Sequence, residues 1–154
     1  MITIIHLLAG AVVGHVLGNI YAAAIFSFVT HYLLDAVPHW SWKPLKNYKD
    51  GGWKNADKLD FFIKAIDPVV GIGLCLYFLY HIPVNLVPSV VVGIIFGWLP
   101  DLMVFLEWKF GIAMPLFIRK FENKFHQHEY SFSGIIPQII VGVLCLYYLI
   151  NIAL

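Results

Sequence analysis

Five apolar runs, separated by short breaks and two longer polar segments, make up most of this chain. A helix needs about 20 apolar residues to cross a bilayer, and about 17 is the short limit. The first two runs are short for this purpose and suit a thinned or tilted region. The pattern predicts five transmembrane helices, over residues 2–17, 20–37, 59–80, 86–106 and 135–154.

Turn signals lie between neighbouring runs. Gly18 and Asn19 predict a tight turn between the first two helices, and residues 81–83 predict another between the third and the fourth. The two longer polar segments, residues 40–58 and 107–133, connect the remaining helices. These turns and segments fix the order in which the chain would cross a membrane.

The composition supports a membrane location. Hydrophobic residues make up 60% of the chain and charged residues 12%, whereas roughly a quarter of the residues in soluble domains are charged. The mean hydropathy of +0.80 agrees with this. We therefore expect an all-α, polytopic membrane protein that forms one embedded domain over residues 1–154 and contacts membrane lipid. The net charge of +1 gives no sign of a nucleic-acid partner.

The basic residues indicate an orientation. Nine of the ten Lys and Arg residues fall in residues 40–58 and 107–133, and the tenth, Lys64, lies just inside the third helix. Counting helices places both segments on the same side as the N-terminus. The positive-inside rule then makes that side cytoplasmic, at the inner membrane, and puts the C-terminus on the far side. The start lacks a positive region followed by a cleavage site, so we expect no cleavable signal peptide.

Residues 114–125 mix aliphatic and aromatic side chains with basic ones, which predicts an amphipathic helix lying in the membrane interface. Small residues elsewhere predict packing. Gly10, Gly14 and Gly18 are spaced four apart, which permits close approach of helices, and in so small a protein we expect these contacts within the chain. Cys75 and Cys145 lie in apolar runs without CxxC spacing, so we expect small core residues.

The most informative polar pattern lies at the end of the second helix, where the sequence reads HYLLDAVPH from His31 to His39. His31 and Asp35 are four apart, so on a helix they share one face and can point at one ion. His39 follows just past Pro38. Burying three such groups in an apolar run is costly unless something binds them. The pattern therefore predicts a metal ion.

Polar residues on the other helices fall at the same depth as this pattern. With a rise of about 1.5 Å per residue, they lie within roughly 10 Å of the cytoplasmic interface. They are His6, Asp67, Asp101, His126 and His128. A His-x-His pair on a helix points in two directions, so at most one of the last two would be a ligand. His15 and His81 fall on the opposite side and are expected to be unrelated.

Each candidate also has a structural interpretation. His6 and His39 could be interfacial histidines, and His31 with Asp35 could form a buried hydrogen-bonded pair. Asp67 and Asp101 adjoin prolines within helices, where their carboxylates could cap backbone N–H groups that the kink frees. These interpretations compete with metal binding at every position.

The donor set favours particular metals. Imidazole and carboxylate without thiolate suit zinc, with manganese or iron(II) as alternatives. The candidate ligands are His6, His31, Asp35, His39, Asp101, His126 and His128, which exceed the needs of one tetrahedral site. We therefore expect one or two divalent ions. Asp67 is the deepest carboxylate, and we expect it to serve as the general base or a bridging ligand.

Three stretches carry a family resemblance: residues 5–11 (IHLLAGA), 30–39 (THYLLDAVPH) and 99–101 (LPD). With them the chain resembles the membrane-bound metal-dependent hydrolases, which include the LexA-binding group of predicted inner-membrane hydrolases. It is more distantly similar to the zinc-dependent phospholipases C and the P1-type nucleases. Those soluble all-α enzymes carry a His-x-x-x-Asp helix followed by a proline and a histidine that bind a zinc cluster.

The resemblance transfers to individual positions. His31, Asp35 and His39 match the zinc-binding pattern, with His39 about two residues closer than usual. His6 matches the early histidine of the membrane group, and Asp101 matches its Pro-Asp element. The chain departs from the pattern after Asp101, where a second Asp is missing, and it lacks a second helical His-x-x-x-Glu pair unless His126 or His128 substitutes.

These features predict a small membrane metallohydrolase that acts on a phosphoester or a lipid-borne substrate at the cytoplasmic interface. Such a centre lowers the pKa of a bound water, and nearby Lys and Arg would hold a phosphate. Two other functions stay open. The chain could be a non-enzymatic metal transporter or sensor, because intramembrane His and Asp often mark ion pathways, or a scaffold with inert polar residues.

Overall fold

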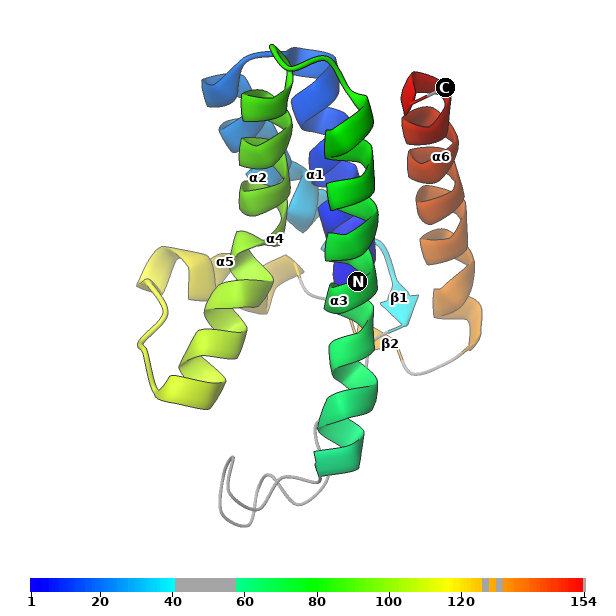
Figure 1. Ribbon diagram of the computed structural model, residues 1–154. Helices are drawn as coiled ribbons and strands as arrows, with labels where there is room; N and C mark the ends of the chain where they lie inside the picture. The colour runs from blue at the N-terminus through cyan, green and yellow to red at the C-terminus, as the bar shows by residue number, and fades with distance from the viewer. Residues whose placement is uncertain (41–57, 126–127, 130–131, 154) are drawn as a thin grey trace.

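The computed structural model describes residues 1–40, 58–125, 128–129 and 132–153 (Figure 1). This part of the chain is predominantly helical, which confirms the all-α expectation. The helices are α1 (Thr3–Leu17), α2 (Ile20–Asp35), α3 (Lys58–His81), α4 (Val87–Phe110), α5 (Leu116–Phe125) and α6 (Ile135–Ala153), with a 3₁₀ turn over Phe132–Gly134 before α6.

The predicted turns are confirmed. At Gly18 the backbone takes a left-handed conformation with φ of 58°, which glycine adopts without steric cost, and its N–H donates to Gly14. Asn19 then caps α2, because its side-chain oxygen accepts from the backbone N–H groups of Tyr21 and Ala22. Helix α3 ends at His81, where the second turn was expected.

Helix α4 extends farther than predicted, to Phe110 rather than to residue 106. The sequence breaks its apolar run at Glu107, but the helix continues through the polar residues. It ends only at Gly111, which adopts a left-handed conformation with φ of 69°. A change in polarity therefore did not coincide with the end of the helix here, whereas the helix-terminating glycine did.

Two short strands were not predicted. β1 (His39–Trp40) pairs in parallel with β2 (His128–Glu129), with His39 opposite His128 and Trp40 opposite Glu129. Two residues are too few to show the alternation that identifies a strand in a sequence. The pairing joins the chain just after α2 to the chain just before α6.

Figure 1 shows how the helices are arranged, with α1 packed against α2, α3, α4 and α6. The α1–α2 turn, the α3–α4 turn and the C-terminal end of α6 lie together at one end of the bundle. The N-terminus and the β1–β2 pair lie toward the opposite end. This is the arrangement that counting the helices predicts, and it gathers the residues singled out above into one region.

At its glycines, the contact between α1 and α4 brings the two backbones directly together. Gly10 and Gly14 of α1 face Gly93 and Gly97 of α4, and a Cβ atom added at Gly93 would lie only 2.2 Å from the Gly10 carbonyl oxygen. A Cβ at Gly10 would lie 2.3 Å from the Gly93 oxygen. The predicted close approach therefore occurs within the chain.

Two of the described helices, α4 and α6, are long and apolar enough to cross a membrane by length and composition. Helices α1 and α2 are apolar but shorter, with 15 and 16 residues. Helix α3 has 24 residues, but its first three turns contain Lys58, Asp60, Lys64 and Asp67. The structure thus supports two spans on these criteria, whereas the apolar runs predict five.

The glycine contact gives a stability prediction. We expect Gly93→Ala to lower the free energy of unfolding by about 1–3 kcal/mol, because the new methyl group must push α1 and α4 apart. Gly73→Ala in α3 is the matched control, since a Cβ there meets nothing within 4 Å and alanine is the better helix former. Denaturant unfolding of both variants in detergent, followed by circular dichroism, tests this; equal stability would contradict it.

Candidate metal centre

The site begins at the C-terminal end of α2, where the spacing of four residues places His31 and Asp35 together as predicted. The His31 Nε2 atom lies 3.3 Å from Asp35 Oδ2. Both residues are buried, and the carboxylate of Asp35 has no solvent exposure. Since an ionised carboxylate without compensation costs several kcal/mol in such a place, the groups around it must supply positive charge or donated protons.

Hydrogen bonds to backbone carbonyls orient two of the imidazoles. The Nδ1 atom of His31 donates to the Gly97 carbonyl at 2.9 Å, and that of His39 donates to the Val37 carbonyl at 2.8 Å. Because a carbonyl only accepts, each Nδ1 carries a proton, and in the neutral ring Nε2 then holds a lone pair. Both Nε2 atoms face Asp35, which is the arrangement of histidines that ligate metals.

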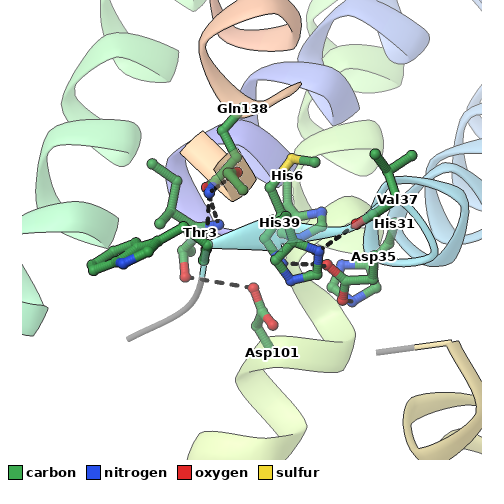
Figure 2. A network of polar contacts seen from close by, with 12 residues as sticks. Thr3, His6, His31, Asp35, Val37, His39, Asp101 and Gln138 are labelled. Atoms are coloured by element: carbon green, nitrogen blue, oxygen red, sulfur yellow. Dashed lines mark hydrogen bonds and ion pairs between the residues drawn. The ribbon is translucent and has the colours of Figure 1, made fainter. Parts of the chain in front are cut away.

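His6 of α1 completes the group around the carboxylate (Figure 2). Its Nε2 lies 3.1 Å from Asp35 Oδ1, and its ring packs on that of His31 with the centroids 4.0 Å apart. His39 Nε2 lies 3.7 Å from the same oxygen. Three buried histidines from α1, α2 and β1 thus converge on one buried carboxylate.

Asp101 of α4 brings a second carboxylate to this group. One ligand atom from each of His6, His31 and Asp101 lies within 4.8 Å of the others, so these three side chains could hold one metal ion. Asp101 is partly exposed, and it accepts a long hydrogen bond of 3.4 Å from the Thr3 hydroxyl. The centre therefore has a dry side at Asp35 and a more open side at Asp101.

An amino group also lies in the centre. The amino nitrogen of Met1 contacts Asp35 Oδ1 and His39 Nε2, and Met1 is buried. As an ammonium it donates to both atoms and balances the charge of Asp35. In this structure the amino nitrogen of Met1 is thus a positively charged group beside Asp35.

Asp67 lies beside the first turn of α1. Its two carboxylate oxygens accept from the backbone N–H groups of Thr3 and Ile4, at 2.8 and 2.9 Å. A carboxylate at this position accepts from backbone N–H groups that have no partner within the helix, and the positive end of the helix dipole stabilises its negative charge. The carboxylate thus caps a neighbouring helix rather than its own Pro68 kink, and a role for Asp67 as general base stays a prediction.

The remaining histidines are placed as follows. His126 lies outside the described residues. The backbone of His128 pairs with that of His39, and its side chain is also outside the described part. His15 contacts the Tyr148 hydroxyl at 3.1 Å, and His81 donates to the Tyr77 carbonyl at 2.8 Å.

Gln138 is a positioning residue that the sequence analysis missed. It is buried in the first turns of α6, its Nε2 donates to the carbonyls of Trp40 and Gly134, and its Oε1 accepts from the N–H of Ile2. A Cβ at Gly134 would lie 2.5 Å from the Trp40 nitrogen. Helix α6 thereby fixes the strand that carries His39. The available signal was an amide side chain in the first turn of an otherwise apolar stretch.

Comparison with known proteins identifies no relative: no family model matches the chain, and no curated protein or solved structure is significantly similar to it.

The cap on α1 gives the second prediction. We expect Asp67→Ala to lower the free energy of unfolding by about 2 kcal/mol, because two backbone donors lose a charged acceptor. Asp67→Asn keeps one acceptor oxygen and is expected to cost about half as much. Denaturant unfolding of both variants in detergent measures the difference. A loss below about 0.5 kcal/mol in Asp67→Ala would contradict the capping role.

Proposed function

We propose that this chain is a membrane-embedded metal-dependent hydrolase acting on a phosphoester. The observation that carries the proposal is the convergence of His6, His31, His39 and Asp35 in a buried group, with Asp101 at its open side. These side chains come from α1, α2, α4 and β1. A purely structural ion pair would not need so many metal-ligating groups at one point.

The spacing of the ligand atoms supports a metal. Zinc binds nitrogen and oxygen ligands at about 2.0–2.1 Å, so neighbouring ligands of a tetrahedral ion lie about 3.3 Å apart. Asp35 Oδ1 lies 3.1 Å from His6 Nε2 and 3.7 Å from His39 Nε2, and Asp35 Oδ2 lies 3.3 Å from His31 Nε2. The donor set fits one or two divalent ions, with zinc first and manganese second.

When bound, the ion would lower the pKa of a water and polarise a phosphoryl oxygen. The chain's own residues would do the rest. Asp35 and the three histidines would hold the ion, and the partly exposed Asp101 would hold it on the side where a substrate can enter. Asp67 is proposed as the general base. It is connected to Asp101 through Thr3, whose N–H donates to Asp67 and whose hydroxyl donates to Asp101.

The membrane setting is part of the proposal. We infer that α1, α2, α3, α4 and α6 are all embedded, that the membrane is the inner membrane, and that the centre faces the cytoplasm. Nine of ten basic residues support this orientation. Helix α5 fits the interface, because it combines Arg119 and Lys120 with exposed Leu116, Phe117 and Phe121.

Metal content tests the centre directly. We expect the protein, purified without chelator, to contain one to two zinc or manganese ions per chain, and His31→Gln and Asp35→Asn to remove most of the metal. His15→Gln is the matched control, because His15 is a histidine of α1 that hydrogen-bonds Tyr148. Elemental analysis of all four proteins measures this. A metal-free wild-type protein would contradict the proposal and favour a scaffold held by the Met1–Asp35 ion pair.

Turnover tests the hydrolase. We expect cleavage of phosphate esters or phospholipids to require the metal and to fall by about 100-fold in Asp67→Asn, the usual contribution of a general base. The same variant should retain its metal, because Asp67 lies outside the group of ligands. Metal binding without hydrolysis across panels of lipids and nucleotides would overturn the hydrolase and favour transport or sensing.

A further inference from the structure

A groove of about 700 Å³ lies between α3 and α6, with α1 as its floor. Its walls include Ile66 and Val70 of α3 and Ile139 and Val143 of α6, and Ile5 forms part of the floor. Sites for small ligands have volumes of roughly 300–1,000 Å³, so the groove is large enough for one.

The groove is open along the outer surface of the bundle, where α3 and α6 stand side by side (Figure 1). Ile66 and Ile139 on its opposite walls are 59% and 58% exposed. In a membrane these side chains would face hydrocarbon. An apolar groove in that position is accessible to a lipid from the side.

Polar groups occur only at one end of the groove. The residues that line this end are Asp67, Gln138 and Trp40, whose carbonyl accepts from the Gln138 side chain. Every other lining residue is apolar or glycine. This division matches an amphiphile with one hydrocarbon chain and a polar head.

The polar end adjoins the candidate metal centre. Trp40 directly follows His39 in β1, and Ile5 directly precedes His6 in α1. Thr3 connects the two regions, because its N–H donates to Asp67 and its hydroxyl to Asp101. A head group at this end would lie next to the open side of the centre.

We propose that the groove binds one acyl chain of a membrane phospholipid and presents its phosphoester to the metal centre. The inference rests on the proposed hydrolase and names its substrate class. A helix from a second copy fits less well, because its apolar side chains would cover Asp67 at the polar end of the groove.

Photolabelling of the full chain tests this. The protein is placed in nanodiscs of phosphatidylethanolamine and phosphatidylglycerol containing a phosphatidylethanolamine with a diazirine on one acyl chain, and labelled residues are mapped by mass spectrometry. We expect labels concentrated on the groove faces of α3 and α6. Ile139→Trp and Val70→Trp should lower this labelling by about tenfold, equivalent to one decade in a binding constant.

Matched controls come from the neighbouring residues. Ile140→Trp and Val69→Trp change side chains that are also exposed, at 54% and 67%, but do not line the groove, so labelling should be unchanged. Labels spread evenly over the outer helices, equal losses in groove and control variants, or a groove left unlabelled while other exposed faces are labelled would overturn the inference.

The same samples separate this inference from the proposed function. Labelling needs neither metal nor turnover. Groove labelling in a metal-free protein would support lipid binding and contradict the proposed hydrolase. Metal in a protein without groove labelling would support the metal centre and contradict the proposed phospholipid substrate.

Discussion

The backbone contact between α1 and α4 is the constraint on which the rest of the structure depends. The two helices run in opposite directions, so each step of four residues forward along α1 meets a step of four back along α4. Gly14 meets Ser89, Gly10 meets Gly93, and the carbonyl of His6 lies against Gly97. Four residues farther along α4, Asp101 lies beside Thr3, which is three residues before His6. The centre is thus the continuation of a glycine seam, at the point where side chains replace backbone contact.

This seam also explains how α2 joins the centre. Where helices approach closely, their carbonyls are accessible to neighbouring side chains, and the Gly97 carbonyl accepts from His31. Within a bilayer, association of helices depends on close packing and interhelical hydrogen bonds, since lipid is as apolar as leucine. The same interaction therefore holds α2 in place and sets the tautomer of a candidate ligand.

The sequence predicted the features that have a local signal. Apolar runs located the helices, Gly18 and Asn19 marked a turn, and the spacing of His31 and Asp35 placed them on one face. Other features have no local signal, because they depend on segments far apart in the chain. Examples are the pairing of His39 with His128, the cap that Asp67 provides to α1, and the bonds of Gln138 to β1. The number of membrane spans depends on thresholds of length and polarity, which α1, α2 and α3 do not reach.

The attachment of β1 to α6 has a consequence for biosynthesis. His6, His31 and Asp35 all lie on α1 and α2, which are consecutive in the sequence and can pair as a hairpin during synthesis. His39, however, is held by a strand whose backbone contacts Gly134 of the 3₁₀ turn and Gln138 of α6. A nascent chain would therefore hold His39 in its place in the centre only after α6 has been made.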